Sequence, residues 1–179
     1  MKITLIAMSG VRACDEELLR LGLTLPGFVE RSKVIASLPS LGLLTLAGMT
    51  PAQHEIQYLE VADLNNEQAV LTELAGVDLV AISSFSAQIG EAYLLADHIR
   101  DRDIPVVLGG LHVTCCPEEA GAHCNAVVLG EGELSWLQVL EDAQKGQLQP
   151  VYDGRGASFN LADAPMPAFE LLDIDKYNR

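Results

Sequence analysis

The stretch DLVAISSFSAQIGEAYLLADHIRDRDIPVVLGG, residues 78–110, decides the fold of this chain. The apolar runs at 78–83 and 104–108 predict two strands that are buried on both faces. Between the runs, apolar residues recur at the spacing of one helix face, at Ile89, Ala92, Tyr93, Ala96 and Ile99. Strands that alternate with helices in this way are typical of a parallel sheet covered by helices.

The same alternation continues on both sides of this stretch. Three further strands are expected at 2–8, 54–62 and 126–129, and helices at 39–49, 65–75, from 117 and after 132. We therefore predict an α/β chain with a flavodoxin-like (Rossmann-like), doubly wound sheet of five parallel strands in the order 2-1-3-4-5, with helices on both faces. The regular pattern stops after Gly146. This predicts a domain at 1–146 and a linker at 147–179, with a small hairpin turn at 151–156.

The composition excludes several functions. The 179 residues include 11 Lys and Arg against 25 Asp and Glu, a formal net charge of −14, and this acidic field would repel nucleic acid. No apolar run approaches the ~20 residues that a membrane span needs. The N-terminal segment is typical of a first strand rather than of a signal peptide. We expect a soluble, cytoplasmic domain whose 4 cysteines are reduced.

Small and polar residues follow four of the expected strands. These strand ends are Ser9-Gly10, Ser83–Ser86, Gly109–His112 and Gly130–Glu133. In doubly wound sheets, ligands bind beyond the carboxyl ends of the strands, and residues without a large side chain let a ligand approach the backbone. Each turn taken alone could be a tight connection between a strand and a helix. The four together indicate the floor of a ligand site.

Several familiar ligand sites do not fit these strand ends. A phosphate-accepting receiver domain needs acidic residues where this chain has Met8-Ser9 and Ile82-Ser83. The phosphate-binding motif GxxxxGK[ST] does not occur, and the dinucleotide motif GxGxxG is incomplete at residues 130–135. The stretch after the first strand is also a poor match to the phosphate loop of flavodoxins.

A group of cysteines and histidines lies between residues 112 and 124: His112, Cys115, Cys116, His123 and Cys124. Zinc could use three or four of them, but their spacing matches no paired CxxC pattern. We expect no metal site here, and interpret the cysteines as small buried apolar residues with His112 separate from them.

Five stretches in order and spacing resemble one known family. They are PSLGLLTLAGM (39–49), DLVAISSFSAQIGEA (78–92), IPVVLGGLHVTCCPEE (104–119), VVLGEGE (127–133) and DAPMPAFELLD (163–173). From residue 38 to 179 the chain resembles the N-terminal cobalamin-binding domain of cobalamin-dependent radical S-adenosylmethionine (SAM) enzymes. The last stretch is similar to the linker that precedes the radical SAM domain in that family.

The resemblance implies a set of cofactor contacts. Ser83-x-Phe85 matches a Ser-x-Leu of cobalamin domains, Gly109-Gly110 matches their paired glycines, and serine hydroxyls would hydrogen-bond the nucleotide tail of the cofactor. Leu111, His112, Gly130 and Glu131 would border the corrin ring. The cofactor-binding residues expected in full are Ser9, Gly10, Arg12, Ser83, Ser84, Phe85, Ser86, Gly109, Gly110, Leu111, His112, Gly130, Glu131 and Gly132.

Two motifs of related enzymes do not occur in this sequence. The Asp-x-His-x-x-G motif, which supplies a histidine to cobalt in methionine-synthase-like domains, is missing. The resemblance therefore implies cobalamin bound base-off, without a histidine on cobalt. The CxxxCxxC motif that holds the 4Fe–4S cluster of radical SAM enzymes is missing as well. We expect a non-catalytic piece of a longer enzyme, whose C-terminal radical SAM domain would bind the cluster and SAM.

The reaction of such an enzyme stays open at this point. The resemblance implies either methyl transfer to carbon or a ring-forming oxidation, as in the anaerobic magnesium-protoporphyrin ester cyclase. A flavodoxin-like regulatory or interaction domain without a cofactor is the alternative function. No residue of this sequence stands out as a general base or nucleophile.

Overall fold

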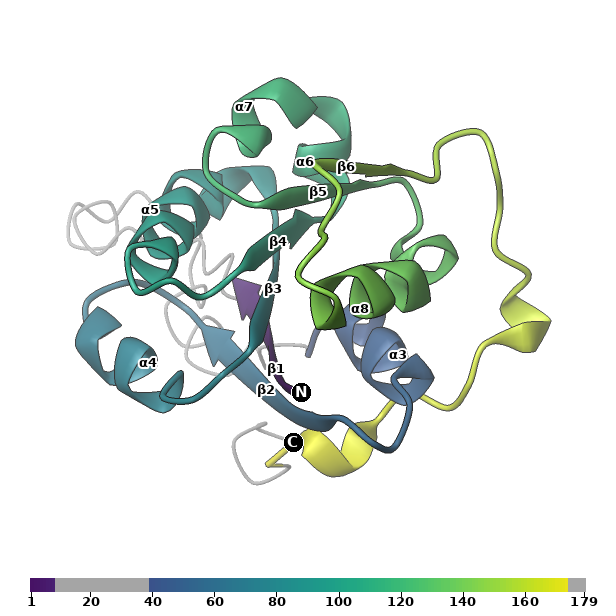
Figure 1. Ribbon diagram of the computed structural model, residues 1–179, viewed down its shortest axis with the longest axis horizontal. Helices are drawn as coiled ribbons and strands as arrows, with labels where there is room; N and C mark the ends of the chain where they lie inside the picture. The colour runs from purple at the N-terminus through teal and green to yellow at the C-terminus, as the bar shows by residue number, and fades with distance from the viewer. Residues whose placement is uncertain (9–38, 174–179) are drawn as a thin grey trace, which may run out of the picture.

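Parallel strands form one open sheet in the computed structural model, which describes residues 1–8 and 39–173 (Figure 1). The strands are β1 (Lys2–Met8), β2 (Glu55–Val61), β3 (Leu79–Ser84), β4 (Val106–Gly109), β5 (Ala126–Leu129) and β6 (Val151–Asp153). The α-helices are α3 (Leu41–Met49), α4 (Glu67–Glu73), α5 (Ile89–Arg100), α6 (Leu111–Cys115), α7 (Pro117–Gly121) and α8 (Trp136–Gln144). Short 3₁₀ helices are η1 (Ser86–Gln88), η2 (Gly132–Leu134), η3 (Leu161–Asp163) and η4 (Phe169–Leu171).

The predicted sheet is confirmed and is one strand wider than expected. The strand order is β2-β1-β3-β4-β5-β6, so the predicted order 2-1-3-4-5 continues into a sixth strand. This strand replaces the hairpin turn expected at 151–156, because Val151 to Asp153 pair in parallel with β5. Tyr152 fixes β6 in place, since its buried hydroxyl donates a hydrogen bond of 2.9 Å to Asp142 on α8. A run of three residues is too short to stand out as a strand in sequence.

Two layers of helices cover the two faces of the sheet. Figure 1 shows α3 and α8 together on one side of the sheet and α4 and α5 on the other. The strand residues alternate between two apolar clusters, as the two-residue period of a strand requires. In β1, for example, Leu5 packs into the α3 and α8 cluster and Ile6 into the cluster beneath α4 and α5. The continuous apolar runs of the sequence therefore fill two cores.

Helix α3 begins where the sequence predicts. Ser40 is its N-cap, and the Ser40 side chain accepts a hydrogen bond from the backbone of Leu43. The helix is less buried than its nearly all-apolar sequence predicts, because Leu41, Gly42 and Gly48 are exposed. Leu43, Leu44 and Ala47 are its buried residues.

The described part of the C-terminal segment, expected as a linker, packs against α3. The backbone of Ala168 donates a hydrogen bond of 3.0 Å to the carbonyl of Leu44, and Ala168 is buried. A Cβ atom at Gly48 would lie only 2.5 Å from the Met166 carbonyl oxygen, so a glycine is required for this close approach. Within residues 1–8 and 39–173, no helix combines the length and the apolarity needed to cross a bilayer.

Candidate functional site

The floor of the candidate site is formed by the small residues at the carboxyl ends of β3, β4 and β5. Ser83 and Gly109 pair directly in the register of β3 and β4. Both lie on the α3 and α8 face of the sheet, because strand residues alternate and their neighbours Ala81 and Val107 belong to that face. Gly130 follows β5 at the same edge. Without large side chains at these positions, the sheet edge stays open.

A cleft of about 150 Å³ lies above this floor. Helix α3 contributes one wall, and η2 with the start of α8 contributes the other. The residues that line the cleft are Ser40, Gly42, Leu43, Leu46, Ala81, Ile82, Ser83, Val107, Gly109, Gly110, Val128, Gly130, Gly132, Glu133 and Trp136. The lining is mainly apolar, with the Ser83 hydroxyl and the Glu133 carboxylate among its few polar groups.

The two walls of the cleft are joined by a hydrogen bond. The indole Nε1 of Trp136, on α8, donates to the hydroxyl of Thr50, at the end of α3, over 2.8 Å. Trp136 is 2% exposed, so this bond satisfies a polar group that is otherwise buried. The bond links the C-terminal end of α3 to the start of α8.

Gly110 and Gly130 have backbone conformations that suit glycine. Gly110 has a φ of 104°, and a Cβ there would lie 3.1 Å from the Ser83 hydroxyl oxygen. Gly130 has a φ of 80°, and a Cβ there would lie 3.1 Å from the backbone of Gly154 and Arg155, which follow β6. Both glycines let the chain turn sharply at the sheet edge without filling the cleft.

The structure brings five of the sequence-predicted residues into the cleft: Ser83, Gly109, Gly110, Gly130 and Gly132. The others that it describes lie outside the lining: Ser84, Phe85, Ser86, Leu111, His112 and Glu131. Ser9, Gly10 and Arg12 fall outside the described residues. The prediction from strand ends thus located the floor, but it did not separate residues that point into the cleft from residues that point elsewhere.

Neighbouring groups account for the side chains that lie outside the lining. The buried Ser84 hydroxyl donates to the carbonyl of Phe85, and the Glu131 carboxylate accepts from the backbone of Phe159. Phe85 and Leu111 are 62% and 75% exposed, so they form an apolar rim at the carboxyl edge of the sheet.

The side chains of Ser86 and His112 contact each other and do not line the cleft. The Ser86 hydroxyl lies 3.0 Å from Nδ1 of His112. Ser86 therefore does not cap α5, which begins at Ile89 without a side-chain cap. The side chain of His112 is 16% exposed, and its other ring nitrogen faces Glu119 on α7.

Sequence reasoning missed the walls of the cleft. One wall comes from α3 and its N-cap, which precede all three strand ends of the floor in the sequence; its residues are Ser40, Gly42, Leu43 and Leu46. The signal for this wall was the nearly all-apolar segment at 39–49, which was predicted as a buried helix but not as part of a site. Trp136 gave no separate signal, because one aromatic residue at the start of a helix is ordinary core material.

All four histidines of the chain lie among the described residues, and none lines the cleft. His54 contacts the N-terminal amine, His98 pairs with Glu67, and His123 pairs with Asp97 over 2.8 Å. His112 lies between Ser86 and Glu119. Among the described residues, the cleft therefore offers no imidazole to a metal ion.

The cysteines do not behave alike, which corrects the expectation that all are buried apolar residues. Cys124 is buried, its thiol donates to the carbonyl of Ala120, and burial raises its pKa to about 11, so it is an inert thiol. Cys115 is exposed and Cys116 is half-buried. His112 is not separate from them either, since its ring nitrogen, the Cys116 sulfur and a Glu119 oxygen lie within 4.8 Å of one another.

The fold and the cleft define an open, doubly wound α/β domain with a mainly apolar cleft at the carboxyl edge of its parallel sheet. The family model of the B12 binding domain matches residues 31–140, and the chain belongs to this family of cobalamin-binding domains.

The curated relatives are longer proteins. A bacteriochlorophyllide d C-8(2)-methyltransferase from Chlorobaculum tepidum is 37% identical over 116 residues, which are 65% of this chain and 24% of that protein. An uncharacterised methyltransferase from Pyrococcus horikoshii is 30% identical over 161 residues, 78% of this chain and 35% of the relative. A hopanoid C-2 methylase from Rhodopseudomonas palustris is 27% identical over 150 residues, 80% of this chain and 27% of the relative. The chain thus spans about a quarter to a third of the length of these relatives. No solved structure matches it significantly.

Proposed function

We propose that this chain holds cobalamin, base-off, in the cleft between α3 and α8, as the cofactor module of a longer, cytoplasmic radical SAM methyltransferase. The observation that carries the proposal is the cleft. The chain is a B12 binding domain, and its cleft lies where the strand ends carry the small residues Ser83, Gly109 and Gly130. When bound, cobalamin supplies a transferable methyl group, and the protein contributes binding, orientation and exclusion of water.

The cleft fits the flat, partly apolar nucleotide tail of the cofactor. Leu43, Leu46 and Trp136 offer apolar and aromatic surface to a base, and the Ser83 hydroxyl at the floor offers a hydrogen bond to the polar part of the tail. Gly109 and Gly110 let the tail reach the backbone. Few, well-placed polar groups in an apolar lining are typical of cofactor sites.

The corrin ring would lie at the mouth of the cleft. Phe85 and Leu111 form the exposed apolar rim there, and an apolar surface of this kind suits the face of a large ring. Ser9, Gly10 and Arg12 remain predicted cofactor contacts. The base-off state is part of the proposal because a nucleotide tail held in the cleft would carry its base away from cobalt.

Methyl transfer is the reaction that we favour for the whole enzyme. The relatives are named as methyltransferases or methylases, whereas none of the five is named as a cyclase. The greater length of these proteins and the resemblance described above support a further radical SAM domain as the partner of this module. The described cysteines are free thiols.

Spectroscopy on the purified chain tests the proposal. After mixing with hydroxocobalamin and desalting, the protein should retain corrin absorbance, and the fluorescence of Trp136, the single tryptophan, should be quenched by the bound corrin. The cob(II)alamin form should show an electron paramagnetic resonance spectrum without nitrogen splitting from an axial base. The blocked variant Gly109→Val should lose both retention and quenching. Its Cβ would lie 3.8 Å from Val128, an ordinary contact, so the fold should persist.

The opposite results favour the alternative function. If the folded wild-type chain retains no corrin and Trp136 fluorescence does not change, the domain is a cofactor-free regulatory or interaction module. If the wild-type chain and Gly109→Val retain cobalamin equally, the cofactor binds elsewhere on the domain and the cleft is not its site.

A further inference from the structure

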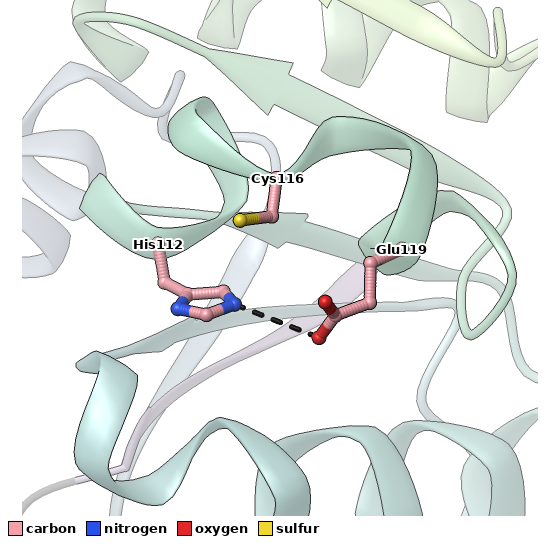
Figure 2. Close-up of side chains that lie close together, drawn as sticks. All are labelled: His112, Cys116 and Glu119. Atoms are coloured by element: carbon pink, nitrogen blue, oxygen red, sulfur yellow. Dashed lines mark ion pairs between the residues drawn. The ribbon is translucent and has the colours of Figure 1, made fainter.

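A second candidate site lies on the other face of the sheet and is independent of the proposed cobalamin cleft. It is formed by His112, Cys116 and Glu119, whose side chains point toward one another from the α6–α7 segment (Figure 2). The imidazole nitrogen, the thiol sulfur and a carboxylate oxygen all lie within 4.8 Å of one another.

The local sequence explains this convergence. His112 and Cys116 are four residues apart, and the backbone of Cys116 donates a hydrogen bond of 2.9 Å to the carbonyl of His112, so both side chains share one side of a helical turn. The chain kinks at Cys116, and Pro117 begins α7. Glu119 in the first turn of α7 then faces back toward His112. Two one-turn helices joined at Cys116 thus aim three ligand atoms at one point.

The geometry between His112 and Glu119 suits two ligands of one metal ion. The Nε2 atom of His112 lies 3.6 Å from Oε1 of Glu119 (Figure 2). This distance is too long for a hydrogen bond. Two ligands of a tetrahedral zinc ion with ordinary zinc–nitrogen and zinc–oxygen distances lie roughly 3.4 Å apart.

Two buried polar atoms at this point have no hydrogen-bond partner among the described residues. One is Nε2 of His112, and the other is the hydroxyl of Tyr93 on α5. The Tyr93 ring packs edge-on to the His112 ring, with 6.4 Å between the ring centroids. Unpartnered buried polar atoms are rare in folded proteins and indicate a group that satisfies them.

His112 is also oriented as zinc-binding histidines are. Its Nδ1 atom lies 3.0 Å from the Ser86 hydroxyl. In the tautomer with the proton on Nδ1, the hydroxyl accepts that proton and the lone pair of Nε2 is directed at the cluster. A second-shell partner of this kind fixes the tautomer and the ring orientation of metal-binding histidines.

We propose that His112, Cys116 and Glu119 bind one zinc ion. Nitrogen, sulfur and oxygen donors together are the ligands that zinc accepts. A thiolate and a carboxylate balance the double charge of the ion. Three protein ligands leave a fourth position for water, to which the Tyr93 hydroxyl can donate. The site requires a kinked α6–α7 segment, and zinc would hold that segment against α5.

Cobalt(II) titration tests the zinc site. The chain is purified without cobalamin, treated with a chelator, kept reduced and titrated with Co²⁺ as a spectroscopic substitute for zinc. We expect one Co²⁺ per chain, a thiolate-to-cobalt charge-transfer band, the strong visible bands of a four-coordinate ion, and loss of all these bands when zinc is added.

Matched variants assign the ligands. Cys116→Ser should abolish the charge-transfer band, while Cys115→Ser, which removes the adjacent exposed thiol, should leave it unchanged. Glu119→Gln should weaken Co²⁺ binding, while the neighbouring Glu118→Gln should not. Ser86→Ala should weaken binding about 10- to 100-fold, the usual cost of losing a second-shell partner. Circular dichroism on each variant confirms that it is folded.

Three results would overturn the proposal. They are a folded wild-type chain that shows no charge-transfer band, a band that disappears equally in Cys115→Ser, and Co²⁺ affinity that is the same in Cys116→Ser as in wild type. Because cobalamin takes no part in the titration, failure here leaves the cobalamin proposal untouched, and failure to retain cobalamin leaves the zinc proposal untouched.

Discussion

The two faces of the sheet differ most at its carboxyl edge. Three neighbouring strands each end in a large residue followed by a small one: Ile82-Ser83, Leu108-Gly109 and Leu129-Gly130. The large residues face α5 and its neighbours and are at most 2% exposed. The small residues that follow them lie at the edge where α3 and α8 leave a cleft.

At these strand ends, consecutive residues have different roles: one packs in the core and the next lines the cleft. The strand alternation sends consecutive residues to opposite faces, so the same strand ends complete a core on one face and open a site on the other. Both faces hold apolar cores that stabilise the fold, but at the carboxyl edge the α3 and α8 face leaves a mainly apolar cleft open for a ligand. Substitutions at neighbouring positions should therefore affect different properties: stability at the large residue and cofactor retention at the small one.

The largest effect on stability is expected at Leu108, on the α4 and α5 face of the sheet. Leu108→Ala should lower the free energy of unfolding by about 2–5 kcal/mol, because it leaves a cavity in a well-packed core. Urea denaturation followed by circular dichroism measures this loss. The folded fraction should keep the cobalamin retention of wild type, whereas Gly109→Val should keep its stability and lose retention. Two results would contradict separate roles for the two faces. One is a loss of cobalamin retention in folded Leu108→Ala, and the other is a stability loss in Gly109→Val as large as that of Leu108→Ala.

A smaller loss is expected at Gly110, where backbone strain rather than packing is tested. Gly110→Ala places a Cβ at a positive φ of 104° and 3.1 Å from the Ser83 hydroxyl, which should cost about 1–3 kcal/mol. Thermal unfolding gives the change. The matched control is Gly90→Ala in α5, where nothing lies within 4 Å of the added Cβ and alanine should stabilise the helix by up to about 1 kcal/mol. Equal effects at the two glycines would contradict the assignment of strain to Gly110.

The hydrogen bond between Trp136 and Thr50, which joins the cleft walls, should contribute about 1–2 kcal/mol to the free energy of unfolding. Thr50→Val removes the acceptor of the Trp136 indole and leaves a buried N–H group without its partner. Thr45→Val is the control, because the Thr45 hydroxyl bonds only within α3, to the carbonyl of Leu41. Denaturation followed by Trp136 fluorescence should show a loss for Thr50→Val alone. If both variants are equally stable, the bond does not hold the walls together.

The smallest effect is a pH dependence of stability, and it comes from a partly exposed pair on α4 and α5. The hydrogen bond from His98 on α5 to Glu67 on α4 raises the pKa of His98 above 6.5. The protonated form is therefore favoured by folding, and its contribution to stability is present below pH 6.5 and lost as the pH rises through the raised pKa. Because the pair is partly exposed, the contribution should be a few tenths of a kcal/mol.

His98→Gln measures this contribution. The variant should be less stable than wild type in mildly acidic buffer and equal to it in alkaline buffer, when the free energy of unfolding is measured across the pH range. A difference that grows toward alkaline pH would show that the sign is wrong.

Much of the fold was predictable because it depends on local patterns. The alternation of strands and helices, and the order 2-1-3-4-5, follow from apolar periodicity and from the right-handed connection of parallel strands. Strand β6 was not predictable, since three residues carry no period and β6 depends on the contact of Tyr152 with Asp142. Half of the site was also predictable: the floor at Ser83 and Gly109 follows from the rule that ligands lie at the carboxyl ends of parallel strands.

The sequence by itself determined five of the strands and the small residues that follow them, because these depend on neighbours along the chain. The order of those five strands followed from the rules for connections in parallel sheets. Only the tertiary structure decided which of those residues share a face, and that α3, which is distant from them in the sequence, forms one wall of the cleft above them. It also decided that His112 turns from the cleft to Ser86, Cys116 and Glu119. The physical reason is that a side chain follows the hydrogen bonds and packing available in space, and those partners come from elements that no local pattern connects.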